Sequence, residues 1–193
     1  MKIIQSPSPN FSKTDYTKIG VQIHKTLGLM PSTLNWLRNP ISFSSAHYLI
    51  AKNGDVHQLV QLKDRAWTAG RIKNISERAR KIMMKTPWGT WVKPGEYLIQ
   101  IEVECLLEET YTEEQFASLA ELFSQFDFQV GEENFLTHRD TASYKPYLED
   151  ERSEILARLY KPDVCDDKKL VLDNWGQLRI ETKDGKIVLY KKL

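Results

Sequence analysis

Two histidines that follow apolar segments could together form a chemical site. His138 follows the apolar residues 135–136, and His24 closes the apolar run of residues 19–24. Both are expected at the ends of buried strands, so they can meet only in the folded protein. Histidines brought together in this way are typical of a catalytic zinc site, in which the protein supplies three ligands and water takes a fourth position. Taken alone, His24 is equally consistent with a polar strand end.

A carboxylate that could transfer protons lies in the strand predicted over residues 97–105. Alternation there places isoleucine and valine side chains on one face and Glu102 on the other. If the strand-end histidines converge on that second face, Glu102 is a candidate general base. The alternative is an ordinary carboxylate on an exposed strand face.

For four further side chains, the sequence is consistent with more than one role. His47 and His57 lie on a predicted hairpin and are interpreted as structural or surface residues. Trp88 and Trp91 lie in a loop rich in proline and glycine, where they either stack on a ligand or close a core.

The elements that must position these residues alternate between strands and helices. Strands are predicted at residues 18–24, 45–51, 55–60 and 97–105, with a tight Asn53-Gly54 turn between the second and third. Helices are predicted at 32–37 with Ser32 as N-cap, after a capping box that starts at Thr112, and from Pro146 to about residue 160. This order predicts an α/β fold with a single mixed central β-sheet flanked by helices.

The last thirty or so residues differ in character from the rest. Asp184-Gly185 centres a predicted hairpin over residues 178–190, and a segment of this length is too short for a core of its own. We therefore expect a main domain at residues 1–160. Residues 161–193 would be a C-terminal extension with a β-hairpin, docking on the main domain or on a partner.

Composition narrows the classes of function. The 193 residues carry a net charge of +1, which gives no support for a nucleic-acid partner. No apolar run approaches the ~18 residues of a membrane span, and the N-terminus lacks the apolar core of a signal peptide. We therefore expect no membrane partner and a protein that is cytoplasmic as synthesised. Two cysteines, Cys105 and Cys165, are too few for a cysteine-based metal site.

Four segments together resemble the zinc-dependent N-acetylmuramoyl-L-alanine amidases of type 2, which include phage lysins, anhydromuropeptide amidases and peptidoglycan-recognition proteins. They are residues 8–11 with 19–24, residues 44–60 running on to 66–70, residues 98–104, and residues 137–140 with Lys145. Their order and spacing match the family over roughly residues 5–160. The resemblance implies a hydrolase that cleaves the bond between N-acetylmuramic acid and L-alanine in peptidoglycan or muropeptides.

The resemblance also implies a role for individual residues. His24 corresponds to the first ligand of the zinc ion, Zn2+, and His138 to the second. Glu102 corresponds to the acidic residue that some members use to activate the water. Lys145 corresponds to the lysine that stabilises the oxyanion.

At two positions the chain departs from the family pattern. Tyr147 stands where the family usually has an Asp or Cys as third zinc ligand, and a phenol is a poor ligand for zinc. Either Glu149 or Asp150 completes the site, or the third ligand is missing. Thr68 stands where relatives often have a histidine near the substrate. Trp67, Thr68 and Tyr147 are therefore expected to contact substrate.

These departures leave more than one function open. The first is a zinc amidase, acting either in recycling of cell-wall fragments in the cytoplasm or as a phage lysin released to the cell wall. The alternative is a catalytically impaired peptidoglycan-binding module of the same fold. A structural role, with the C-terminal hairpin as a docking strand, is the third.

Overall fold

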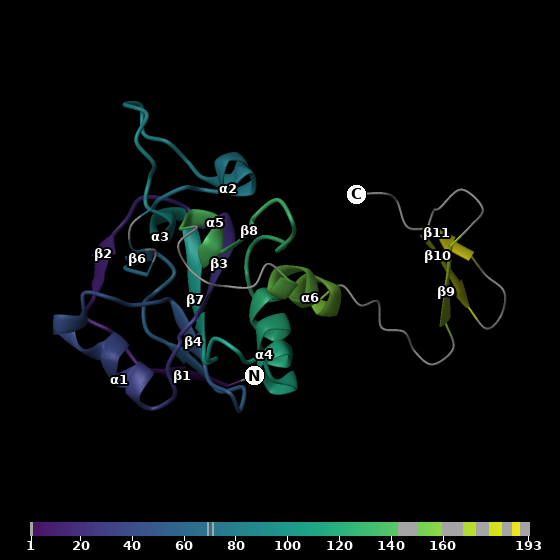
Figure 1. Cartoon of the computed structure of the whole chain (residues 1–193), viewed down its shortest axis with the longest axis horizontal. Helices are drawn as coiled ribbons and strands as arrows, with labels where there is room; N and C mark the ends of the chain where they lie inside the picture. Colours follow the sequence, from purple (N-terminus) through teal and green to yellow (C-terminus); the bar gives the residue numbers. More distant parts are fainter. Residues whose placement is uncertain are drawn as a thin grey trace. The chain divides into compact units, whose positions relative to one another are not determined.

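A mixed sheet lies at the centre of the computed structural model, which describes residues 2–68, 70, 72–142, 150–159, 168–172, 178–182 and 187–189. The chain divides into two units, Met1–Arg158 and Leu159–Leu193. The sheet belongs to the first unit (Figure 1). Its strands are β1 (Ile3–Gln5), β3 (Gly20–Lys25), β4 (Tyr48–Ile50), β5 (Val56–Gln58), β7 (Leu98–Val103) and β8 (Phe135–Thr137).

The strand order is β1-β5-β4-β7-β3-β8. Strand β3 runs parallel to both β7 and β8, and β4 is parallel to β7, so four neighbouring strands end at the same edge. Strands β4 and β5 form the antiparallel hairpin predicted around Asn53-Gly54, where Gly54 adopts a positive φ of 82°. The prediction of a single mixed central sheet is confirmed.

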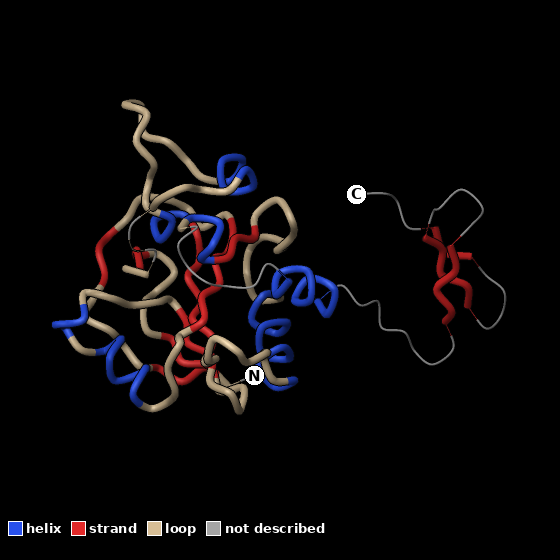
Figure 2. The backbone as a smooth tube through the Cα atoms, in the orientation of Figure 1, coloured by secondary structure: helices blue, strands red, loops and turns tan. Residues whose placement is uncertain are grey.

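Seven helical segments accompany the sheet in the described part of the first unit. They are α1 (Ser32–Arg38), the 3-10 turn η1 (Pro40–Ser42), α2 (Glu77–Ile82), α3 (Pro94–Tyr97), α4 (Glu113–Phe123), α5 (His138–Thr141) and α6 (Asp150–Leu159). Helices α1 and α4 lie on opposite sides of the sheet (Figures 1 and 2). Phe123 of α4 packs edge-on against Phe135 of β8, with ring centroids 6.1 Å apart. Leu37 of α1 belongs to the same apolar cluster as Leu49 of β4.

The two faces of the sheet differ in polarity. All six residues of β3 are buried, so helices or loops cover both faces at this strand. The α4 face carries branched and aromatic side chains, whereas the α1 face carries Gln22 and His24 from β3 and Gln100 and Glu102 from β7. A row of polar groups inside a covered face is costly unless the groups bond to one another. This row of polar groups is therefore a candidate functional site.

The helix signals predicted from sequence have mixed outcomes. The capping box at Thr112 is confirmed, since its Oγ1 accepts from the N–H of Gln115 at 3.1 Å and the Gln115 side chain accepts in return. The assignment of Ser32 as an N-cap is wrong: Pro31 is the N-cap, and the Ser32 hydroxyl donates backward to the Leu29 carbonyl at 2.6 Å. Pro146 lies outside the described residues.

Several strands differ from their predicted bounds. Three short strands were not predicted: β1, β2 (Phe11–Lys13) and β6 (Asp64–Ala66), of which β2 pairs with β6. These three-residue strands carry no alternating apolar pattern, and their partners are distant in sequence. Strand β4 begins at Tyr48 rather than at residue 45.

The second unit contains an antiparallel sheet of its own in the residues that the structure describes. Strand β10 (Leu178–Thr182) pairs with β9 (Lys168–Leu172) on one side and with β11 (Ile187–Leu189) on the other. The sequence predicted β10 and β11 but not β9, and the turn at Asp184-Gly185 lies outside the described residues. Across the described ranges, no helix combines the length and the apolar character needed to span a membrane.

Candidate metal centre and active site

The two strand-end histidines lie side by side in the folded protein. His24 is the penultimate residue of β3, and His138 follows β8 directly as the first residue of α5. Because β3 and β8 are parallel neighbours, both residues come to the same edge of the sheet. Their ring centroids are 4.6 Å apart at an angle of 74°, and the two residues are only 1% and 8% exposed.

The turn that carries His138 is held by one carboxylate. Asp140 accepts the backbone N–H of Thr137 at 2.9 Å and the hydroxyl of Ser76 at 2.7 Å. Arg152 of α6 also donates to it at 3.1 Å. The strand-to-helix turn is therefore fixed from three directions, and so is the position of the imidazole that starts the helix.

The other histidine is held by a group that the sequence analysis did not single out. The Nε2 atom of His24 lies 2.8 Å from the side-chain oxygen of Gln100 on β7, and both residues are buried. The sequence contains one indication of this contact: Gln22 alternates with His24 and Gln100 with Glu102, so each glutamine is expected on the same strand face as a candidate site residue. A glutamine on the same face as a candidate ligand is a natural partner for its second ring nitrogen.

His47 supports this arrangement from the neighbouring strand. Its Nδ1 accepts the backbone N–H of Gln100 at 2.8 Å, and its Nε2–H donates to the carbonyl of Asp64 at 3.0 Å. The ring thus occupies the place of a ladder hydrogen bond, which is why β4 starts only at Tyr48. Burial, followed by the nearby charge of Lys18, lowers the pKa of His47 to about 3. The interpretation of His47 as structural agrees with these contacts.

Glu102 is the Cα partner of His24 in the parallel ladder, so the two side chains leave the sheet on the same face. It is half-buried and faces a cavity of about 440 Å³ between the ends of the strands and α1. The other lining residues are small hydroxyl-bearing or apolar side chains: Thr26, Ser32, Thr33, Trp36, Leu37 and Ser44. A carboxylate beside an open cavity and a histidine pair is well placed for proton transfer.

Trp67 and Thr68 follow β6, and neither lines the cavity that Glu102 faces. Trp67 lines a second cavity of about 250 Å³ together with Phe43 and the cationic Arg65 and Lys93. Its indole N–H donates to Ser12 at 2.7 Å. Thr68 is buried, and its hydroxyl donates to the backbone carbonyl of Ser45. Contact of either residue with a substrate stays a prediction.

The two tryptophans of the loop before α3 differ from each other. Trp91 is half-buried and packs against the cluster that contains Met83 and Leu136, so it closes a core. Trp88 is 87% exposed at the tip of the loop. Neither lines the cavity that Glu102 faces.

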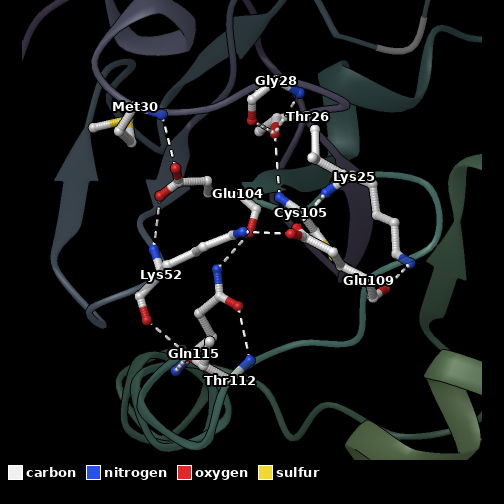
Figure 3. A network of polar contacts seen from close by, with 11 residues as sticks. Lys25, Thr26, Gly28, Met30, Lys52, Glu104, Cys105, Glu109, Thr112 and Gln115 are labelled. Atoms are coloured by element: carbon white, nitrogen blue, oxygen red, sulfur yellow. Dashed lines mark hydrogen bonds and ion pairs between the residues drawn. The ribbon is translucent and has the colours of Figure 1, made fainter.

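A second polar network fixes the strand ends beyond the site (Figure 3). The buried carboxylate of Glu104, two residues after Glu102, accepts the backbone N–H groups of Met30 at 2.7 Å and Lys52 at 2.8 Å. Gln115 of α4 donates to the Glu104 carbonyl at 2.8 Å. One side chain thereby joins the segment before α1 to the segment after β4.

The remaining predicted site residues lie at the C-terminal end of the segment that resembles the family. Lys145, Tyr147 and Glu149 lie outside the described residues, and Asp150 is the first residue of α6. Among the described ranges, no three His, Cys, Asp or Glu side chains are grouped as metal ligands. The donor chemistry of His24 and His138 suits zinc, and the pair would supply two of the three ligands of a catalytic site.

Comparisons with known proteins point to one family. The family model for N-acetylmuramoyl-L-alanine amidase matches residues 16–147. The 1,6-anhydro-N-acetylmuramyl-L-alanine amidase AmpD of Haemophilus influenzae is 37% identical over 78 residues, which cover 40% of this chain and 35% of that protein. The match thus spans about a third of the length of this curated relative.

Solved structures share the fold at low sequence identity. A selenomethionine derivative of AmpD aligns with a TM-score of 0.58 at 20% identity, covering 80% of this chain and 92% of its own. A mutant endolysin from Bacillus subtilis gives 0.58 at 17%, covering 82% and 99%. AmiD from E. coli, in complex with anhydro-N-acetylmuramic acid-L-Ala-D-gamma-Glu-L-Lys, gives 0.55 at 22%, covering 76% and 60%. With a family model that matches most of the chain and a sheet of the same architecture, the chain belongs to the N-acetylmuramoyl-L-alanine amidase family.

Proposed function

We propose that this protein is a zinc-dependent amidase that hydrolyses the bond between N-acetylmuramic acid and L-alanine in peptidoglycan or muropeptides. The observation that carries the proposal is the contact between two buried imidazoles, His24 and His138, at the edge where the parallel strands end. Glu102 on the next strand supports it, because it leaves the sheet beside His24 and faces a cavity. Family membership supports the same reaction.

Each residue has a separate task in this proposal. His24 and His138 would hold zinc, with a third ligand from Glu149 or Asp150. Zinc, when bound, supplies a Lewis acid that polarises the amide carbonyl and lowers the pKa of a water molecule. The carboxylate of Glu102 would accept a proton from the attacking water and pass it to the leaving nitrogen of L-alanine.

The wider surroundings of the site would bind the substrate. The ammonium of Lys145 would stabilise negative charge that develops on the carbonyl oxygen in the transition state. The exposed face of Trp36 and the hydroxyl groups around Glu102 offer an aromatic surface and hydrogen-bond partners for a glycopeptide. Trp67, Thr68 and Tyr147 are proposed to contact the same substrate.

The experiment compares wild type with His138→Ala, using His57→Ala as the matched control. His57 is a half-buried histidine on β5 that bonds to Ser6, away from the ring pair. Metal content is measured by mass spectrometry, and release of stem peptide is measured on a soluble anhydromuropeptide. We expect wild type and His57→Ala to hold zinc and cleave, and His138→Ala to do neither. Wild type that holds no zinc and releases no peptide would refute the proposal.

A binding module of the same fold is the second candidate, and the tyrosine at the usual third ligand position favours it. Two histidines alone would hold zinc weakly, whereas the cavity beside Glu102 would persist. This candidate predicts that wild type binds a muropeptide in calorimetry without turnover at saturating zinc. It also predicts that Tyr147→Asp gains both zinc and hydrolysis.

The same assay separates two settings for the amidase. A recycling enzyme would cleave soluble anhydromuropeptides much faster than intact cell wall. A lysin would release peptides and solubilise purified cell walls. The ratio of the two rates, measured with one enzyme preparation, decides between them.

A further inference from the structure

We propose that Gln100 is a positioning residue for metal binding: its amide oxygen holds His24 as the Nε2–H tautomer and so reserves Nδ1 as the metal donor. The inference rests on the proposed zinc function and adds a residue that directs one of its ligands. It follows from the 2.8 Å contact between Nε2 of His24 and Oε1 of Gln100, inside a region where both residues are at most 1% exposed.

The orientation of the Gln100 amide is set by a second contact. Its side-chain nitrogen donates to the carbonyl of Leu98 at 3.4 Å. Exchanging the amide oxygen and nitrogen would set the oxygen against that carbonyl, which accepts hydrogen bonds but cannot donate them. The oxygen therefore faces His24. A glutamine oxygen only accepts, so the ring nitrogen at 2.8 Å must carry the hydrogen.

The backbone of Gln100 is equally constrained. Its N–H donates to Nδ1 of His47 at 2.8 Å, and its carbonyl accepts the N–H of His47 at 2.9 Å. Both partners belong to the segment that leads into β4, and β7 lies between β4 and β3. The glutamine side chain therefore starts from a fixed point in the middle of the sheet and reaches across to β3.

The consequence for His24 follows from imidazole chemistry. A neutral ring carries one hydrogen, so a hydrogen on Nε2 leaves the lone pair on Nδ1. A hydrogen bond from the non-ligating nitrogen also fixes the ring orientation and raises the basicity of the ligating one. Loss of such a partner typically lowers metal affinity by about 10–100-fold.

The test uses the metal-free full-length protein with ¹⁵N-labelled histidine, at a pH near 8 where imidazoles are neutral. Long-range ¹H–¹⁵N correlation spectra report the tautomer of each ring. The His24 signals are assigned by their loss in His24→Ala. His47 serves as an internal reference, because its Nδ1 accepts from an N–H and its Nε2 must carry the hydrogen.

Gln100→Leu removes the acceptor at nearly constant volume, and Gln115→Leu is the matched control. Gln115 is also fully buried and makes two side-chain hydrogen bonds, but these go to Thr112 and Glu104. We expect Nε2–H for His24 in wild type and in Gln115→Leu. In Gln100→Leu we expect the Nδ1–H form to appear and the zinc affinity, measured against a chelating indicator, to fall by about 10–100-fold.

Two results would overturn the inference. One is an Nδ1–H tautomer for His24 in wild type, which decides the matter even if Gln100→Leu does not fold. The other is a folded Gln100→Leu with the wild-type tautomer and wild-type zinc affinity. Failure of the proposed function is a separate outcome: a protein that shows the Nε2–H tautomer but cleaves no muropeptide loses the amidase assignment and keeps the role of Gln100.

Discussion

Glu102 differs from the other polar residues on the α1 face of the sheet because it faces a cavity. Glu102→Gln keeps the size of the side chain and removes its capacity to accept a proton. We expect kcat on a soluble muropeptide to fall by about 10²–10⁴-fold, the usual range for a lost general base. Zinc content should be unchanged, since the two histidines remain.

Glu108, which is exposed and follows the end of β7, provides the matched control. Glu108→Gln removes the same charge from the chain without touching the cavity, so its kcat should equal that of wild type. If Glu102→Gln hydrolyses at the wild-type rate, proton transfer belongs to another group.

His47 makes stability depend on pH. Its pKa is about 3 in the folded protein because of burial, against about 6.5 in an unfolded chain. Between these values the unfolded state binds the additional proton, so the free energy of unfolding falls as the pH decreases from about 6.5 toward 3. The slope from this group approaches about 1.4 kcal/mol per pH unit. Above pH 6.5 the contribution of His47 to stability is fully present.

Urea unfolding of wild type and His47→Asn between pH 7 and 4 measures this contribution. The asparagine oxygen can accept the N–H of Gln100 in place of Nδ1, and it does not titrate. The other three histidines are the same in both proteins, so the difference between the two curves isolates His47. We expect wild type to lose stability faster on acidification, and parallel curves would contradict the assignment.

These residues show what the sequence could and could not predict at the site. His24 and His138 could be predicted as site residues because each is a polar residue at the end of an apolar run, a pattern that the sequence alone contains. The link from Gln100 to His24 requires knowing that β7 lies beside β3, and the role of His47 requires the register of β4 against β7. Pairing between distant strands is not encoded in local periodicity.

At the level of elements, Glu104 connects segments that the ladder leaves apart. Its carboxylate accepts two backbone N–H groups, and Figure 3 shows it between Met30 and Lys52. Glu104→Ala leaves both donors without an acceptor in a buried region, at about 1–3 kcal/mol for each. We expect the free energy of unfolding to drop by about 2–6 kcal/mol in urea denaturation.

The control for this prediction is Glu108→Ala, because Glu108 is exposed. That substitution should change the free energy of unfolding by no more than about 0.5 kcal/mol. Equal effects of the two substitutions would mean that water replaces the carboxylate of Glu104 without loss.

How well each helix or strand could be predicted depends on the strength of its local sequence signal. The hairpin at Asn53-Gly54 and the helix that starts at Thr112 carry turn and capping residues, which act over a few positions and were predicted correctly. The short strands β1, β2 and β6 have three residues each and depend on partners far along the chain. The prediction of Ser32 as an N-cap was wrong because its hydroxyl donates to a preceding carbonyl instead of accepting a following N–H.

For the molecule as a whole, the division into two units bears on the C-terminal extension predicted at residues 161–193. Among the residues whose burial the structure describes, the buried apolar side chains run from Val21 to Leu156, and these lie within the first unit. Helix α6 contributes Ile155 and Leu156 to that core, and its Arg158 lies 3.9 Å from the ring centroid of Phe116 on α4. The first unit therefore needs α6, which ends at Leu159.

Two truncated chains test where the folding unit ends. A chain of residues 1–160 keeps α6, and we expect it to unfold cooperatively and to match the full chain in zinc content and in turnover of a soluble muropeptide. A chain of residues 1–149 exposes the sites of Ile155 and Leu156, each worth about 1.5–3 kcal/mol when buried. We expect that shorter chain to lose about 3–6 kcal/mol of stability by urea denaturation, or not to fold. A 1–160 chain that is unfolded would contradict an independent main domain, and would mean that residues 161–193 supply part of its stability.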